Sequence, residues 1–184
     1  MAAKSNLKNM ALSLTLVCLV CSAILGIVYA FTAEPVRKAE LAKTNASIAR
    51  VLPAFEGVPT QQMTSWKGVD YPYYSVEGAG YAIISRVNGF GGPLTLMVGI
   101  GEDGLIVNTV VLSHAETPGL GAKCASDASF IDQFKGWNTA EKRLAVVKDG
   151  GDVDAITAST ITSRAYALAV ANAYEVYKQL KGDE

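Results

Sequence analysis

The stretch LTLMVGIGEDGLIVNTVVL, residues 94–112, decides the fold of this chain. Apolar and β-branched residues dominate Leu94–Ile100 and Leu105–Leu112, and both runs have the length of ordinary strands. Between them lies Glu102-Asp103-Gly104, and the Asp-Gly pair is strongly favoured in short hairpin turns. The pattern therefore predicts an antiparallel hairpin.

Two shorter runs of the same kind precede this hairpin, Tyr71–Val76 and Gly80–Val87. The glycine-rich segment Asn88–Pro93 is interpreted as a connecting turn and not as a phosphate loop, because no helix follows it. Before these runs, Gly57–Gly68 is polar and turn-prone. Arg143–Lys148 is a further candidate strand.

Helical patterns flank the predicted sheet. From Ser163 to Lys181, apolar residues recur on one stripe of a helix. Upstream, Pro35 can open a helix that ends near Pro53. Helices at both ends of an antiparallel sheet give the fold class α+β, and residues 34–184 form one domain without repeats.

The 25 residues between Lys8 and Glu34 carry no formal charge, enough for a helix to cross a hydrocarbon core of about 30 Å. A cleaved signal peptide is the alternative, because Val28 and Ala30 have the spacing of a cleavage site. Signal sequences, however, have shorter apolar cores of about 7–15 residues. We therefore expect residues 1–33 to be a short N-terminus and a retained, single-pass transmembrane anchor.

The distribution of charge excludes some partners and orients the anchor. The 184 residues include 16 Lys or Arg and 17 Asp or Glu, so the net charge of −1 lacks the basic excess of nucleic-acid-binding proteins. Half of the residues are hydrophobic and 18% are charged, which excludes a disordered chain. Lys4 and Lys8 flank the apolar run, so the positive-inside rule places the N-terminus in the cytoplasm and residues 34–184 outside.

The three cysteines do not predict a metal or redox site. Cys18 and Cys21 lie in the apolar run, where cysteine behaves as a small apolar residue, and two thiolates do not complete a metal shell. Cys124 is the single cysteine of residues 34–184, so it cannot form a disulfide within the domain.

The segment DAITASTITSR, Asp154–Arg164, places five hydroxyl side chains directly before the C-terminal helix. Any one of them could be only a helix cap. A helix start also collects free amide donors and the positive end of the helix dipole, which stabilise a phosphate, and Arg164 could add a positive charge. A phosphate linked to one of these hydroxyls is therefore physically reasonable.

A second segment, HAETPGLGAK, His114–Lys123, follows the last strand of the hairpin. Pro118-Gly119 predicts a rigid turn. Glu116 and Thr117 in such a turn are placed to hydrogen-bond a planar heteroaromatic ligand, with the glycines letting the backbone approach its rim. His114, the single histidine of the chain, is interpreted as a structural residue, because no nucleophile or second ligand accompanies it.

These features together resemble the G subunit of the Rnf ion-translocating electron-transport complex. The resemblance covers practically the whole chain and rests on the anchor, the Gly-Phe-Gly-Gly-Pro turn, the hairpin around Gly104, the HAETPGLG segment and Asp154–Arg164. A more distant similarity is to the C subunit of the sodium-pumping NADH:quinone reductase, which shares the flavin-binding domain. The resemblance implies a single transmembrane helix followed by an FMN-binding domain with an antiparallel sheet and flanking helices.

The resemblance also implies the site. In that family a flavin transferase, using FAD and magnesium, joins FMN through its phosphate to a threonine in a Thr-Gly-Ala-Thr-x-Thr-Ser segment. The match places the covalent acceptor at Thr160, although Ala158-Ser159 replaces the family's Gly-Ala and makes Ser159 a rival hydroxyl. The other expected flavin-binding residues are Glu116, Thr117, Leu120, Gly121, Thr157, Ser159, Thr162 and Ser163.

The implied function is that of an electron carrier in an ion-translocating ferredoxin:NAD oxidoreductase of the bacterial inner membrane, with sodium or protons as the coupling ion. The chain would be a redox subunit without an acid–base pair or metal of its own. Its expected partners are the A, B, C, D and E subunits, the membrane and, during maturation, the flavin transferase. The alternatives are the quinone-reductase subunit and a membrane-tethered binding or scaffold protein without flavin.

Overall fold

The computed structural model describes residues 7–55 and 59–182. Their contacts divide the chain into two units, with the boundary between Thr44 and Asn45. Helix α1, Leu7–Val51, makes up the described part of the first unit and contributes its C-terminal end to the second. Lys4, one of the two lysines used to orient the anchor, lies outside the described residues.

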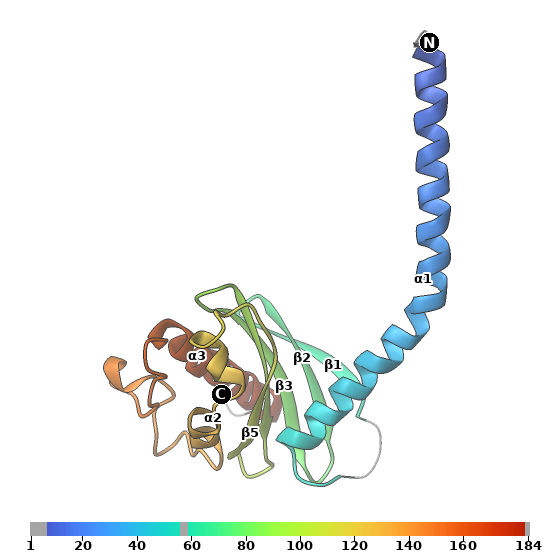
Figure 1. Cartoon of the computed structure of the whole chain (residues 1–184). Coiled ribbons are helices and arrows are strands. Elements are labelled where there is room, and N and C mark those ends of the chain that lie inside the picture. The colour runs from blue at the N-terminus through green and yellow to red at the C-terminus, as the bar shows by residue number, and fades with distance from the viewer. Residues whose placement is uncertain (1–6, 56–58, 183–184) are drawn as a thin grey trace. The chain divides into compact units, whose positions relative to one another are not determined.

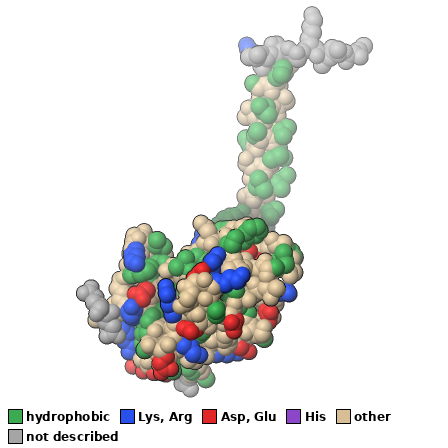
Figure 2. Space-filling model, turned by 90° about the vertical axis from the view of Figure 1, so that its left-hand side faces the viewer, with side chains coloured by type: hydrophobic (Ala, Val, Ile, Leu, Met, Phe, Trp, Pro, Cys, Tyr) green, Lys and Arg blue, Asp and Glu red, His purple; other side chains and the backbone are tan. Residues whose placement is uncertain are grey.

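The N-terminal part of α1 is long and apolar enough to cross a membrane. Figure 2 shows hydrophobic and uncharged side chains along this part of the helix, with the acidic and basic side chains elsewhere. Pro35 lies inside α1, so the expectation that it opens a separate helix is wrong. A proline inside a helix removes one backbone amide donor. Helix α1 nevertheless continues on both sides of Pro35.

The second unit contains one antiparallel sheet whose five strands lie side by side in sequence order (Figure 1). The strands are β1 Gln61–Trp66, β2 Val69–Val76, β3 Gly80–Asn88, β4 Pro93–Ile100 and β5 Ile106–His114. The predicted hairpin around Gly104 is confirmed, with Met97 of β4 opposite Val110 of β5. The two earlier predicted strands correspond to β2 and β3, and the α+β fold class is confirmed.

Strand β1 was not predicted from the sequence. We expected Gly57–Gly68 to be a turn-prone stretch, and residues 56–58 of it lie outside the described part. Gln61–Trp66 instead pairs with β2 at the edge of the sheet. Most of its side chains are exposed, so the alternation of apolar and polar residues that marks a half-buried strand is missing.

Both faces of the sheet are covered. Helix α3, Thr160–Lys181, lies across β3 and β4, which confirms the predicted C-terminal helix (Figure 1). Its buried alanines, Ala165, Ala169 and Ala173, let the helix backbone approach the sheet closely. On the opposite face, the end of α1 packs its buried Ile48, Val51 and Leu52 against Met97 and Val110.

The chain between β5 and α3 forms only short helices: η1 Gly121–Ala125, α2 Ala128–Ile131, η2 Asp132–Phe134 and η3 Val147–Asp149. The predicted strand Arg143–Lys148 is therefore wrong. Val146 makes one isolated parallel bridge to Val153, and the residues that follow it form the short helix η3, which ends at Gly150 in the left-handed conformation at φ 76°. The hydroxyl-rich segment Asp154–Arg164 follows these short elements and runs into the start of α3.

A buried tyrosine joins α3 to the sheet. Tyr166 is fully buried, and its hydroxyl lies 2.8 Å from the Oγ1 atom of Thr109 in β5. The rings of Phe130 and Phe134 each pack 5.0 Å from the Tyr166 ring, measured between centroids. Burial raises the pKa of Tyr166, so its hydroxyl stays neutral and available for this hydrogen bond.

This hydrogen bond gives a test of the fold. Tyr166→Phe and Thr109→Val each leave a buried hydroxyl without its partner, so each is expected to lower the free energy of unfolding by about 1–3 kcal/mol. The double variant removes both hydroxyls and should cost less than the sum of the single changes. Urea denaturation of the full-length chain in detergent measures all three values, and strict additivity would contradict the contact.

Candidate functional site

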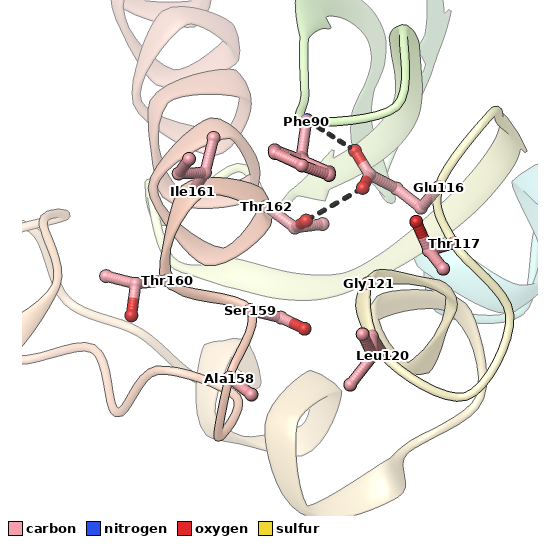
Figure 3. A pocket seen from close by; sticks show the side chains of 10 residues that line it. All are labelled: Phe90, Glu116, Thr117, Leu120, Gly121, Ala158, Ser159, Thr160, Ile161 and Thr162. Carbon is pink, nitrogen blue, oxygen red and sulfur yellow. Dashed lines mark hydrogen bonds between the residues drawn. The ribbon is translucent and has the colours of Figure 1, made fainter.

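Three segments distant in sequence enclose a cavity of about 380 Å³. The turn between β3 and β4, the loop after β5 and the start of α3 form its walls (Figure 3). Its size falls within the range of about 300–1,000 Å³ typical of small-molecule sites. The lining residues are Phe90, Glu116, Thr117, Leu120, Gly121, Ala158, Ser159, Thr160, Ile161 and Thr162.

The carboxylate of Glu116 holds the three walls together. Its Oε1 atom accepts a hydrogen bond from the backbone N–H of Phe90 at 2.8 Å, and its Oε2 atom accepts one from the Thr162 hydroxyl at 2.9 Å (Figure 3). The N–H of Gly91 adds a longer contact of 3.4 Å. The side chain is 5% exposed, and these donors offset the cost of burying it.

Two glycines leave room for this carboxylate. A Cβ atom at Gly121 would lie 2.5 Å from Oε2 of Glu116 and 2.8 Å from the Thr162 hydroxyl. A Cβ atom at Gly89 would overlap Oε1 of the same carboxylate. A side chain at either position would therefore push the carboxylate away from its hydrogen-bond donors.

The loop after β5 is the tight turn that Pro118-Gly119 predicts. The carbonyl of Thr117 accepts hydrogen bonds from the N–H of Leu120 at 3.2 Å and from that of Ala122 at 3.1 Å. His114 lies outside the cavity lining, and its Nδ1 atom accepts a hydrogen bond from the N–H of Glu116 at 3.2 Å. The histidine thus supports the backbone of the loop, as its structural interpretation requires.

Cys124 lies in η1, directly after this loop, and is buried. Burial, together with the negative charge of Glu116, raises the pKa of its thiol to about 11. The thiol is therefore protonated at neutral pH and a poor nucleophile.

The start of α3 forms the third wall. Ser159 occupies the cap position but makes no side-chain capping bond among the described residues. Ser163 instead stabilises the backbone here, because its hydroxyl donates to the Ser159 carbonyl at 3.0 Å and accepts from the N–H of Ile156 at 2.9 Å. A helix start without a side-chain cap presents amide donors and the positive end of its dipole.

Ala158 adopts an unusual backbone conformation at the rim of the cavity. Its φ angle is 60°, and the N–H of Ser159 bonds to the carbonyl of Ile156 at 3.0 Å, closing a four-residue turn. Turns with a positive φ at the third position favour glycine. The alanine of this chain therefore occupies a strained position.

Most residues expected at the site lie together in the cavity wall: Glu116, Thr117, Leu120, Gly121, Ser159, Thr160 and Thr162. Thr157 and Ser163 do not line it. Arg164 was expected to add a positive charge at the site. It forms a bidentate ion pair with Asp149, with both N···O distances 2.7 Å. Each partner stabilises the charge of the other, raising the pKa of Arg164 and lowering that of Asp149.

Sequence reasoning missed three lining residues, Phe90, Ala158 and Ile161. Phe90 is 68% exposed and Ile161 is 51% exposed, so together with Leu120, at 46%, they form an apolar rim. A phenylalanine between glycines in a turn has little chance of entering a core, and that signal could have identified Phe90. An apolar rim next to buried polar groups suits a flat aromatic ligand with a polar end.

Within the described ranges, 7–55 and 59–182, no group of three or more His, Cys, Asp or Glu side chains could hold a metal ion. The chemistry of the cavity is that of hydroxyls, backbone amides, one carboxylate and apolar side chains.

Comparison with known proteins identifies the family. The FMN-binding domain family matches residues 89–175. The G subunit of the ion-translocating oxidoreductase complex of Shewanella piezotolerans is 32% identical over 185 aligned residues, which cover 91% of this chain and 87% of that protein. The chain belongs to the G-subunit family of ion-translocating oxidoreductase complexes. Its N-terminal apolar helix is in keeping with a component of a membrane-bound complex.

Other members of the G-subunit family are similar over comparable lengths. The G subunit of the Na⁺-translocating ferredoxin:NAD⁺ oxidoreductase complex of Acetobacterium woodii is 29% identical, covering 94% of this chain and 92% of that one. Among solved structures, the C subunit of the Na⁺-translocating NADH-quinone reductase of Parabacteroides distasonis matches with a TM-score of 0.47 and 29% identity. That match covers 59% of this chain and 61% of the other.

The role of Glu116 in this member of the G-subunit family can be tested by substitution. Glu116→Ala removes the acceptor for two walls and should lower the free energy of unfolding by about 2–3 kcal/mol, and Glu116→Gln should cost less. Hydrogen exchange of the Phe90 amide should accelerate in both. Glu102→Gln is the control, because that exposed carboxylate also accepts a backbone N–H, from Gly78 at 3.0 Å. Equal losses in the Glu102 and Glu116 variants would contradict the role of the buried carboxylate.

The backbone at Ala158 gives a second prediction. Ala158→Gly relieves the cost of a positive φ and should raise the free energy of unfolding by about 1 kcal/mol. Ala155→Gly is the matched control, at a position of the same segment without a positive φ, and should be neutral or destabilising. Chemical denaturation measures both, and a loss of stability in Ala158→Gly would show that this turn is not strained.

Proposed function

We propose that this chain is the electron-carrier subunit of an ion-translocating ferredoxin:NAD oxidoreductase, and that its cavity holds FMN joined by a phosphoester to Thr160. The observation that carries the proposal is the position of the cavity. All ten lining residues fall within residues 89–175, the range that matches the FMN-binding domain family. The proposed reaction is taken from the name of the complex to which the Acetobacterium relative belongs, a ferredoxin:NAD⁺ oxidoreductase.

The residues of the cavity fit the parts of FMN. Phe90, Leu120 and Ile161 offer apolar contact to a flat ring system, while Glu116, Ser159 and Thr162 are buried in the wall. The start of α3 offers amide donors and a positive dipole to the phosphate. FMN exchanges electrons singly or in pairs, so when bound it can link two-electron donors with one-electron centres. The chain itself positions the cofactor and supplies no acid–base pair.

Accessibility favours Thr160 over Ser159 as the acceptor. Ser159 is 7% exposed and turned toward the loop that contains Gly121, whereas the half-buried Thr160 lies at the edge of the cavity (Figure 3). A flavin transferase must reach the hydroxyl that it modifies. In the proposed step, Thr160 Oγ1 bonds to the FMN phosphorus of FAD, the pyrophosphate bond breaks, AMP leaves and the hydroxyl proton passes to solvent.

The membrane arrangement follows from the same proposal. Residues 1–33 would be a cytoplasmic N-terminus and a single-pass anchor in the bacterial inner membrane, with residues 34–184 on the extracytoplasmic side. A covalent link would keep the cofactor on a domain that stands outside the cytoplasm. The partners would be the A, B, C, D and E subunits of the Rnf complex, with the flavin transferase acting during maturation.

Substitution of the acceptor tests the proposal. Full-length chain coexpressed with a flavin transferase should give a fluorescent band on a denaturing gel and an intact mass increased by one FMN minus one water. Thr160→Val should lose both signals because the hydroxyl is absent. Thr139→Val is the matched control, since Thr139 is half-buried like Thr160, lies outside the hydroxyl-rich segment and does not line the cavity, and it should keep both.

Two outcomes would contradict the proposal. Full flavin occupancy in Thr160→Val would place the link on another residue. A wild-type chain whose intact mass equals that of the bare polypeptide, after coexpression with a transferase active on another substrate, would rule out the covalent flavin.

A further inference from the structure

The hydroxyl of Ser159 lies in the cavity wall without a partner. Its Oγ atom is buried and has no hydrogen-bond partner among the described residues. The side chain extends from the start of α3 toward the loop that contains Leu120 and Gly121 (Figure 3). It therefore occupies the cap position of a helix without capping it.

A buried hydroxyl without a partner destabilises a folded chain, because it has lost its hydrogen bonds to water and gained none. Ser163 makes the backbone bonds at this turn, so Ser159 is not needed there. The strained Ala158 directs the chain into the turn that precedes Ser159. The fold thus keeps the Ser159 hydroxyl at a position that lowers the stability of the chain and that borders a cavity large enough for a ligand.

We propose that the Ser159 hydroxyl forms a hydrogen bond to the FMN carried by its neighbour Thr160 and so positions the cofactor against the wall of the cavity. This inference rests on the proposed function. Ser159 acts here as a positioning residue, because it takes no part in electron transfer.

A second buried hydroxyl makes a matched control possible. Ser85 in β3 is fully buried, and its Oγ atom also has no partner among the described residues, but it does not line the cavity. Ser85→Ala and Ser159→Ala therefore make the same chemical change in two surroundings. Only the second change would remove a contact with FMN.

The experiment compares melting temperatures of the full-length chain, in detergent, with and without flavin loaded by coexpression with a transferase. In flavin-free chain, both variants should melt about 2–4 °C higher than wild type, because each loses a hydroxyl without a partner. The increase in melting temperature that flavin produces should be about 2–4 °C smaller in Ser159→Ala than in wild type, and unchanged in Ser85→Ala. Intact mass confirms that each loaded sample carries the adduct.

The outcomes separate this inference from the one on which it rests. Full occupancy with the same flavin-dependent increase in Ser159→Ala and wild type would overturn the Ser159 contact and leave the proposed function intact. Loss of the adduct in Ser159→Ala would also overturn it, because Ser159 would then be the acceptor. A wild type without adduct would overturn both.

Discussion

The site depends on one buried carboxylate. Glu116 accepts hydrogen bonds from the N–H of Phe90 and from the hydroxyl of Thr162, and so joins a hairpin turn, a loop and a helix start that are far apart in the sequence. A buried charge is tolerated only where donors surround it, so the three segments must approach together or leave the carboxylate unsatisfied. Gly89 and Gly121 permit that approach, since a side chain at either would collide with the carboxylate. The cavity is the space that this arrangement leaves.

The hydroxyl groups at the start of α3 have different roles. Ser163 stabilises the backbone, Thr162 donates a hydrogen bond to Glu116, Ser159 lies in the wall of the cavity and Thr160 lies at its edge. In our proposal the exposed edge is where the transferase attaches FMN, and the buried wall is where the cofactor is positioned. Helix amides and dipole favour a phosphate at this point, while Arg164 is already paired with Asp149. A covalent link would let the remaining walls position the ring without also having to retain it.

Strong local signals made much of the fold predictable. The Asp-Gly turn between two apolar runs identified β4 and β5, and the apolar stripe after Ser163 identified α3. Strand β1 could not be found in this way, because it is an exposed edge strand held by pairing with β2. The predicted strand Arg143–Lys148 was wrong because its local pattern is typical of a strand, but no described strand lies beside it to pair with. At the site, the sequence identified polar residues on two walls. The flanking glycines of Phe90 indicate an exposed side chain, but its position in the third wall depends on a hydrogen bond across 26 positions, which no local pattern shows.

The central claim is that one hydroxyl at the start of α3 carries FMN. Trypsin should release Asp149–Arg164 as one peptide, because no Lys or Arg interrupts it, and this peptide holds all five candidate hydroxyls. Tandem mass spectrometry of that peptide from chain matured with its transferase tests the claim most directly. The account predicts one FMN phosphoester, with fragment ions that place it on Thr160. An unmodified peptide at full recovery, or fragments that place the adduct on Ser159 or Thr157, would contradict it.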